Sequence, residues 1–266
     1  MEDSIRVVIS PDRCVSCGLC IQDCASHALK LTENGVACTR PCLECGHCVA
    51  ICPAHAVSMP ELDMADVTEY DPDSFSVDPD HLLNLMKFRR SVRSFTSQPV
   101  SDKVLMQILQ AGRHAPTAKN VQGLHFVALQ KELPAFRQAF WDAMPDVIAA
   151  CGADDPAARL CARFYEKHQK TGYDPFFMNA PAVLLVCGGS FWDAGLAAGN
   201  MELMASANGL GFLHDGFLQQ ALLHAPQLLE PLGLADIPVT ACMLTGYAER
   251  TYARTAPRKM TDLQVR

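Results

Sequence analysis

Apolar residues recur with a helical period in two segments of the central chain. In HLLNLMKFRRS, Leu82, Leu85 and Met86 share one face, and Asp78 and Pro79 precede them as the expected cap and first-turn residues. The segment SDKVLMQILQAGRHA predicts a second helix, which Ser101 caps. The apolar side of this second helix is formed by Val104, Leu105, Ile108 and Leu109.

Three other segments have the pattern of strands. GLHFVALQ, residues 123–130, is short and β-rich, and VTACMLTGYAE, residues 239–249, is the last strand candidate. PAVLLVCGG, residues 181–189, is a continuous apolar run, which is typical of a strand buried on both faces. Strands and helices alternate without a regular βαβ rhythm, so a doubly wound parallel sheet is not expected. GLGFLH has only the first half of a G-x-G-x-x-G motif, so a nicotinamide-binding Rossmann site is not indicated.

Two longer regions are also helical in pattern. Residues 131–173 have one polar face, and breaks are expected at Pro145 and at ADDP. From Asp193, DAGLAAGNMELMASANGLG predicts a long helix that Gly209 and Gly211 end. Small residues on this helix would let another helix approach closely, namely Gly195, Ala198 and Gly199.

The segment from Glu61 to Pro79 is acidic, has two Asp-Pro steps and shows no sustained period. We therefore expect domains at 1–60 and 81–266, joined by a linker or strap at 61–80. A flexible linker would be rich in glycine and serine, whereas apolar residues in this segment suit an extended strap that packs and holds the domains together. These apolar residues are Leu62, Met64, Val67, Tyr70 and Phe75.

The N-terminal domain contains two cysteine runs with the same spacing. CVSCGLCIQDC, residues 14–24, and CLECGHCVAIC, residues 42–52, both read C-x2-C-x2-C-x3-C, and each cysteine recurs 28 residues later. Gly18 and Gly46 lie inside the turns, where the absent side chain lets the backbone curl close around sulfur. Bacterial ferredoxins hold iron–sulfur clusters with this pattern, and the fourth ligand of each cluster is borrowed from the other run.

The first sixty residues thus resemble the two-cluster bacterial ferredoxins. The resemblance implies one 4Fe-4S cluster on Cys14, Cys17, Cys20 and Cys52, and a second on Cys42, Cys45, Cys48 and Cys24. One departure is Ala25 after Cys24, where the pattern has a proline such as Pro53. Two alternatives remain. Zinc would need only pairs of C-x-x-C and would leave half of the cysteines surplus, and a disulfide framework would need an oxidising compartment.

Composition narrows the class of protein. The chain has 266 residues, 49% of them hydrophobic, which suffices for one small domain and one of ordinary size. With 22 Lys+Arg against 29 Asp+Glu, it is not basic enough to indicate a nucleic-acid partner, and no apolar run has the length of a membrane span. The start, MEDSIRVVIS, lacks the pattern of a secretion signal, so the thirteen cysteines indicate the reducing cytoplasm.

Five cysteines lie outside the two runs. Most stand in apolar surroundings and are expected to be buried, inert thiols. Cys38 is the one near a run, where it could be a spare ligand or a redox-sensitive thiol. The other four are Cys151, Cys161, Cys187 and Cys242.

A second set of motifs begins at the end of the first predicted helix. FRRSVRSF, from Phe88 to Phe95, gathers guanidinium groups and a serine hydroxyl, which bind phosphate well; alone, such a cluster is also typical of a solvated helix end. It is followed in order by HAPTAKNVQGLHFVAL, NAPAVLLVC, DAGLAAGNMELMASANGLGF and GYAERTYARTAPRK. From about His81 to the C-terminus, this ordered set resembles the nitroreductase family of FMN flavoproteins.

The resemblance implies roles for particular residues. Contacts with the FMN phosphate and the N1/O2 edge of the ring are implied for Arg89, Arg90, Ser91 and Arg93. The loop that meets the isoalloxazine is matched by Pro116, Thr117, Asn120 and Gln122. Asp215 and Gly216 match a loop near N5, and Arg258 and Lys259 match a basic pair at the ribityl phosphate. Considered without the family, Asn120 could simply cap a turn and Arg258 could be a solvated tail residue.

The family also implies an α+β fold, with a mixed sheet flanked by helices, and a homodimer that binds FMN at the subunit interface. The helix from Asp193 is the natural dimer contact, although a plain core helix would have the same pattern. Gly123 and Leu124 stand where many relatives have Pro-Trp, which removes an aromatic residue near the active site. No catalytic side chain is assigned, because the chemistry belongs to N5 of FMN. His114, His125 and His214 are as well explained as hydrogen-bonded core histidines.

Together, the two domains predict an oxidoreductase in which 4Fe-4S clusters exchange electrons with FMN, and FMN reduces a nitro compound, quinone or enone. An external ferredoxin or NAD(P)H could be the donor. Two alternatives use the same parts. One is an electron-transfer or redox-sensing module that serves a protein partner, and the other is NAD(P)H oxidation with the clusters as outlet. Because tunnelling weakens steeply with distance, we expect the nearer cluster to lie beside FMN.

Overall fold

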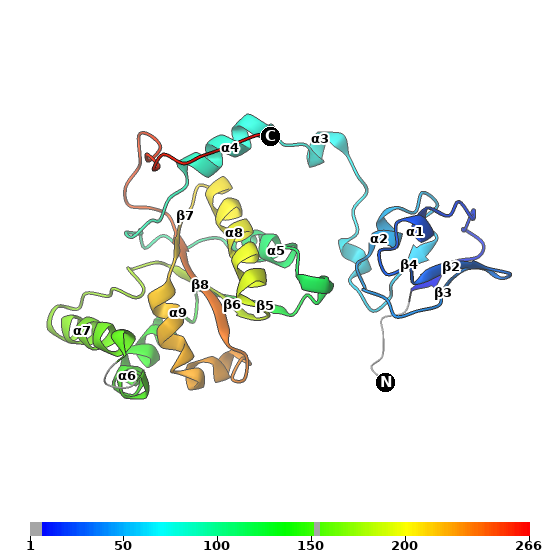
Figure 1. The fold of residues 1–266 in the computed structure, drawn as a ribbon. Coiled ribbons are helices and arrows are strands. Elements are labelled where there is room, and N and C mark those ends of the chain that lie inside the picture. The colour runs from blue at the N-terminus through cyan, green and yellow to red at the C-terminus, as the bar shows by residue number, and fades with distance from the viewer. Residues whose placement is uncertain (1–6, 152–154) are drawn as a thin grey trace. The chain divides into compact units, whose positions relative to one another are not determined.

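The structure, a computed structural model, describes residues 7–151 and 155–266. The chain divides into two compact units. The first comprises Met1–Ser76 together with Lys119–Val121, and the second comprises Val77–Ala118 and Gln122–Arg266. Figure 1 shows the elements of both units, which are described separately below.

The first unit is built from two short antiparallel ladders and two single-turn helices. β1 (Val8–Ile9) pairs with β4 (Val57–Ser58), and β2 (Leu29–Thr32) pairs with β3 (Gly35–Cys38). Gly18 begins α1 (Leu19–Gln22) and Gly46 begins α2 (His47–Ala50). Their φ angles of 76° and 72° lie in the left-handed region, which glycine adopts without strain, so both glycines serve the turns as predicted.

The internal repeat of the sequence is also a repeat of backbone conformation. Ser16 and Glu44, which are 28 residues apart, have φ angles of 55° and 57°, and His27 and His55 have 51° and 47°. The apolar core beneath these turns is small and consists of Val7, Leu29, Val36, Val57 and Met59. Six cysteines of the two runs are half-buried against it, namely Cys14, Cys20, Cys24, Cys42, Cys48 and Cys52.

The predicted strap contains two short helical turns, η1 (Met64–Asp66) and α3 (Pro72–Phe75). Leu62 and Met64 pack against the core of the first unit, as an apolar strap should. The prediction of an extended, packed segment is wrong for the remainder, because Val67, Tyr70 and Phe75 are at least half exposed. The rings of Tyr70 and Phe75 instead contact each other, with centroids 5.6 Å apart.

The second unit contains a four-stranded sheet in the order β5 (Leu124–Leu129), β6 (Ala182–Gly188), β8 (Val239–Gly246) and β7 (Gly211–His214). Every ladder between these strands is antiparallel. Within residues 7–151 and 155–266, parallel pairing is confined to one bridge between Ser91 and Phe212, so the predicted mixed sheet is corrected to an antiparallel one with a parallel bridge at its edge.

Helices cover both faces of this sheet. α5 (Asp102–Arg113) and α8 (Phe191–Ala207) lie on one face, whereas α6 (Leu133–Cys151), α7 (Pro156–Thr171) and α9 (Gly216–Leu223) lie on the other (Figure 1). Alternate residues of β6 enter the two cores, so this strand is buried on both faces, as its continuous apolar run predicts. The remaining helical elements are α4 (Pro79–Phe88), η2 (Ala118–Asn120) and η3 (Pro226–Leu232).

Helix starts follow the predicted caps. Asp78 accepts a hydrogen bond from the backbone N–H of His81 at 2.7 Å, and Ser101 accepts one from Val104 at 3.3 Å. α8 begins at Phe191, two residues earlier than predicted, because Ser190 and Asp193 form a reciprocal capping box.

Two features of the second unit depart from the sequence pattern. α6 continues through Pro145, although a break was predicted there. Proline in a helix interior costs roughly 3 kcal/mol. Apolar side chains on both sides of it, including Met144 and Val147, are fully buried, and their burial offsets that cost. The predicted break at ADDP lies partly outside the described residues, and Asp155 caps α7 at its described end. β7 was not predicted at all, since FLHDGF was interpreted as a loop.

Gly112 on α5 is tightly packed, since an added Cβ would lie 2.8 Å from the Phe126 ring on β5 and 2.9 Å from the Met201 sulfur on α8. Alanine usually stabilises a helix relative to glycine by about 1 kcal/mol, but overpacking of a core costs about 1–3 kcal/mol. We therefore expect Gly112→Ala to lower the free energy of unfolding by up to about 2 kcal/mol. Denaturant unfolding followed by the fluorescence of Trp141 and Trp192, the two tryptophans of the chain, reports on this unit. Gln107→Ala on the exposed face of α5 is the control, and equal stability of the two variants would contradict the prediction.

Candidate functional site

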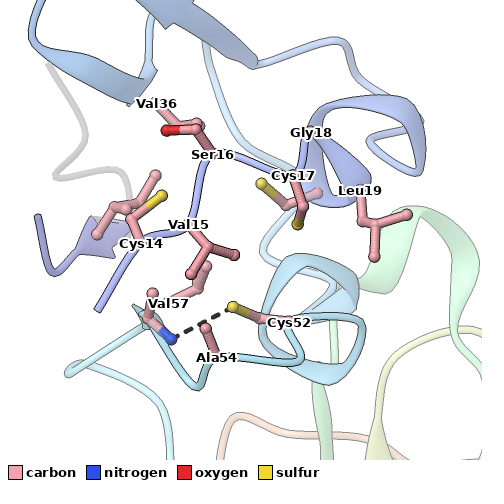
Figure 2. A pocket seen from close by; sticks show the side chains of 13 residues that line it. Cys14, Val15, Ser16, Cys17, Gly18, Leu19, Val36, Cys52, Ala54 and Val57 are labelled. Carbon is pink, nitrogen blue, oxygen red and sulfur yellow. Dashed lines mark hydrogen bonds between the residues drawn. The ribbon is translucent and has the colours of Figure 1, made fainter. Parts of the chain in front are cut away.

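Two cavities in the first unit are lined by cysteines. The first gathers Cys14, Cys17 and Cys20 from one run with Cys52 from the other, beneath apolar residues that include Val15 and Val57 (Figure 2). The second gathers Cys42, Cys45 and Cys48 with Cys24, again three cysteines from one run and one from the other. The cavities are alike in size, at about 20 Å³ each. The turns begun by Gly18 and Gly46 aim three thiols of each set inward from one short stretch of backbone.

Backbone amides donate hydrogen bonds to the sulfurs that cross between the runs. Ala28 N–H donates to Cys24 Sγ at 3.2 Å, and Ala56 N–H donates to Cys52 Sγ at 3.3 Å. These two bonds are related by the 28-residue repeat. The Ser26 hydroxyl lies 3.5 Å from Cys24 Sγ. Such donors stabilise a thiolate more than a thiol.

The thiols of the cavities perturb one another. Burial, together with the neighbouring thiols of Cys42 and Cys45, raises the pKa of Cys48 to about 11. Burial likewise raises the pKa of Cys20 and Cys42. Burial also opposes ionisation of Cys24, but its hydrogen bonds outweigh burial and its pKa is lowered. Converging thiolates repel unless positive charge lies between them, which is the electrostatic requirement that bound iron satisfies.

No group of three or more His, Cys, Asp or Glu side chains among residues 7–151 and 155–266 is arranged to hold a single metal ion. A cluster places each thiolate on a different iron, so its ligands lie farther apart than the ligands of one ion.

The arginine-rich segment after α4 lies along the edge of the sheet in the second unit. Val92 N–H donates to the Phe212 carbonyl oxygen at 2.9 Å, and Thr96 N–H donates to the Tyr247 carbonyl oxygen at 2.8 Å. Gly211 permits this approach, because an added Cβ would lie 2.8 Å from Val92. The backbone of this segment is thus fixed at both ends.

This segment and the chain after β8 form a cavity with positively charged walls. Its lining includes Ser91, Arg93, Arg250 and Tyr252, and the Arg90 guanidinium stacks 4.1 Å from the centre of the Tyr252 ring. Guanidinium groups and a hydroxyl at one cavity are donors suited to a phosphate. Arg250 was missed by the sequence analysis, although it lies in the quoted motif GYAERTYARTAPRK.

Arg89 has a different environment from its neighbours. Its Nη1 lies 3.0 Å from Oε1 of Glu202 on α8, and the other carboxylate oxygen lies 3.4 Å from His214 Nε2. Glu202 is buried, and burial opposes its ionisation. The hydrogen bond with His214 and the charge of Arg89 outweigh burial and hold the pKa of Glu202 below its ordinary value. Glu202 was also missed, and its signal is a lone acid within the apolar stretch MELMASA.

The other residues implied by the family lie in three places. In the loop after α5, Thr117 Oγ1 accepts from Gln122 N–H at 3.0 Å, and Pro116 is exposed. Asn120 belongs to the first unit, where its Nδ2 donates to the Glu44 carbonyl oxygen at 2.9 Å. Positive φ angles at Lys119, Asn120 and Gln122 mark this loop as strained, which is a feature of functional sites. Arg258 and Lys259 are exposed in the tail beyond β8, outside the cavity lining.

Asp215 is the N-cap of α9, and Gly216 is the first residue of that helix. Asp215 Oδ1 accepts hydrogen bonds from Phe217 and Leu218, whereas Oδ2 is buried and has no partner. Burial, with a smaller contribution from the charge of Asp174, raises the pKa of Asp215 to about 6. The carboxyl therefore stabilises the start of the helix at the cost of a buried charge at neutral pH.

The thiols outside the cysteine runs match their predicted environments in part. Cys161, Cys187 and Cys242 are buried, and burial raises the pKa of each, which makes them inert. Cys151 is half-buried, whereas Cys38 is exposed and lines the second cysteine cavity. No helix in the described part of the chain has both the length and the apolar character needed to span a membrane.

The sequence profile of the nitroreductase family matches residues 86–247, which include the arginine-rich segment, the whole sheet and most of the helices. The chain belongs to the nitroreductase family. This membership makes it an oxidoreductase. No curated protein sequence matches the chain.

Solved structures show the same nitroreductase fold. A nitroreductase with bound FMN from Bacteroides fragilis is 20% identical, with a TM-score of 0.58. A nitroreductase with bound FMN from Desulfitobacterium hafniense is 21% identical, with a TM-score of 0.52. A BluB-like flavoprotein from Clostridium difficile is 18% identical, with a TM-score of 0.51. Each similarity covers 71% of this chain and all of the other. The predicted α+β nitroreductase fold is thereby confirmed.

Asp215 gives the nitroreductase domain a specific pH dependence. Because its folded pKa of about 6 exceeds the ordinary value of 3.8, the stability that it contributes is complete below about pH 4 and is lost as the pH rises through 6. Asp215→Asn keeps the cap oxygen without the charge. We expect the variant to be more stable at pH 8 by about 2–3 kcal/mol and nearly unchanged at pH 4. Tryptophan-detected unfolding across this range checks the prediction.

Asp193→Asn is the matched control, because hydrogen bonds from Ser190 and Ala118 hold the pKa of Asp193 below its ordinary value. Its contribution to stability is present at neutral pH and lost in acid, so this variant should lose stability at pH 8. A pH profile for Asp215→Asn that parallels the wild type would contradict the assignment.

Proposed function

We propose that this chain is an FMN-dependent oxidoreductase whose first unit carries two 4Fe-4S clusters that exchange electrons with the flavin. The observation that carries the proposal is the presence, in one chain, of a nitroreductase domain and two cavities with crossed sets of four cysteines. The electron acceptor proposed is an electron-poor nitro compound, quinone or enone.

Cluster binding is supported by the composition of each cavity. Three thiols come from one turn and the fourth crosses from the other run, which is the ligand arrangement of two-cluster ferredoxins. Ala28 and Ala56 donate to the crossing sulfurs, and hydrogen bonds of this kind tune the reduction potential of a cluster. Cys14, Cys17, Cys20 and Cys52 would hold the first cluster, and Cys42, Cys45, Cys48 and Cys24 the second.

FMN binding is supported by the positively charged cavity and by the FMN bound in the Bacteroides and Desulfitobacterium nitroreductases. When bound, FMN supplies the chemistry that collects single electrons and delivers them in pairs as hydride. Ser91, Arg93 and Arg250 would hold its phosphate, and Arg90 would add positive charge from the Tyr252 ring. The strained loop at Thr117 and Gln122 would position the ring, and the backbone at Gly216 would approach it.

A homodimer is proposed from two exposed apolar helix faces. On α8, Phe191, Trp192 and Leu196 are 66%, 85% and 50% exposed, and nothing lies within 4 Å of an added Cβ at Gly195 or Gly199. α4 exposes a second apolar set, namely Leu82, Leu83, Met86 and Phe88. Large exposed apolar faces on neighbouring helices are typical of subunit interfaces, and open glycines let a second helix pack closely.

Cofactor content tests the cluster proposal. Protein purified without oxygen should contain about eight iron and eight acid-labile sulfide per chain. Cys24→Ala should keep about half, because the lost ligand belongs to the cluster held by Cys42, Cys45 and Cys48. Cys151→Ala, which lies outside both runs, is the control and should keep the full content. Zinc in place of iron, or an unchanged content in Cys24→Ala, would contradict the assignment.

FMN retention tests the positively charged cavity. A hydrogen bond between charged groups contributes about 1.5–3 kcal/mol, so Arg250→Ala should weaken FMN binding by about 10- to 100-fold. Arg258→Ala should have a smaller effect, because an exposed tail residue must be ordered before it can bind. Fluorescence titration of the apo-proteins with FMN measures both affinities. Equal affinity of Arg250→Ala and wild type would remove Arg250 from the site.

A further inference from the structure

The two cysteine cavities differ in one residue. The second cavity is lined by a fifth cysteine, Cys38, in addition to Cys24, Cys42, Cys45 and Cys48. The first cavity has no fifth cysteine in its lining. The position equivalent to Cys38 in the first repeat, 28 residues earlier, is Ser10. The two halves of the repeat therefore have equivalent sets of four cysteines, and the second cavity has the additional thiol of Cys38.

Cys38 is held at the cavity by the β2–β3 hairpin. It is the last residue of β3 and pairs with Leu29 of the buried core, and the next residue, Thr39, donates its N–H to the Ala28 carbonyl oxygen at 2.7 Å. The residues between Cys38 and Cys42 are therefore a short loop that begins at a fixed strand end.

The Cys38 thiol is not committed to another strong interaction. Its recorded partner is the Arg40 carbonyl oxygen, at 3.4 Å, and a thiol is a weak donor. The side chain is exposed, so turning the sulfur toward the cavity breaks no apolar packing. Ligation of iron is much stronger than a thiol hydrogen bond, and thiolates are the ligands that iron–sulfur clusters prefer.

We propose that Cys38 is a reserve ligand of the second cluster, able to take the iron otherwise held by Cys42. The inference rests on the proposed clusters. In the exchange, the iron–sulfur bond to Cys42 breaks and a bond to Cys38 forms. The proton of the Cys38 thiol passes to the departing Cys42 thiolate, and no electron is transferred. The second cluster would then survive the loss of Cys42, whereas the first would not survive the loss of Cys14, the equivalent ligand.

Iron and sulfide analysis of single and double variants tests this directly. Wild type, Cys38→Ser and Cys42→Ala should each hold about eight iron and eight sulfide per chain after anaerobic reconstitution. Cys42→Ala/Cys38→Ser should hold about four of each. Cys14→Ala is the matched control in the first repeat, and it should also fall to about four, because Ser10 stands where a reserve thiol would be needed.

A content of about four in Cys42→Ala would overturn the inference, as would a content of about eight in the double variant. A wild type far below eight would instead contradict the proposed clusters themselves, so the two failures are distinguishable. A second measurement uses variants with all eight proposed ligands intact, which removes any dependence on the folding of Cys42→Ala. An iron chelator should remove iron several-fold faster from Cys38→Ser than from wild type, and equal rates would count against a reserve ligand.

Discussion

Crossed placement of cysteine thiols is the constraint on which the first unit depends. Among its described residues, the main buried apolar cluster comprises Val7, Leu29, Val36, Val57 and Met59, which is small for a stable fold. The cysteines surround that core, and the two sets share members across the repeat. If the proposed clusters are bound, each joins the first half of the unit to the second, so cofactor binding and folding become one equilibrium. Gly18 and Gly46, whose left-handed turns lie within the two cysteine runs, are part of this arrangement of thiols.

In the nitroreductase domain, the placement of charged side chains is the constraint on which the candidate FMN site depends. The segment from Ser91 to Thr96 is fixed by backbone hydrogen bonds along the sheet edge, which brings Arg93 and Arg250 to one cavity. Arg89 is separated from them by its pairing with the buried Glu202. Positively charged groups are thus divided between a cavity open to a ligand and an internal pair that anchors the end of α4 to α8. This division explains why adjacent arginines in one motif need not share a role.

Local signals in the sequence were sufficient for much of this structure. The caps at Asp78 and Ser101 and the double-sided burial of β6 follow from single residues or short patterns, so they could be predicted. Features that depend on tertiary contacts could not. β7 is four residues long and is defined by its pairing with β8, and α6 passes through Pro145 because buried side chains flank it.

Candidate site residues likewise divide into those that the sequence could predict and those that depend on tertiary contacts. The resemblance to two-cluster ferredoxins implied which cysteines belong together, and each cavity is lined by one of those sets. Motif order pointed to Arg258 and Lys259 and not to Arg250, because a motif does not reveal which basic residue lines the cavity. The place of Cys38 at the second cavity required the register of the β2–β3 hairpin, which the sequence does not specify.

The central claim is that the clusters supply electrons to the flavin of the same protein. The most direct test is anaerobic stopped-flow measurement of flavin absorbance after mixing with a reduced ferredoxin, in wild type and in Cys14→Ala/Cys17→Ala at equal FMN occupancy. Our account predicts rapid flavin reduction in wild type, and in the variant a fall to the slow rate of the isolated nitroreductase domain. Flavin reduction at the wild-type rate in a variant that has lost its first cluster would contradict it.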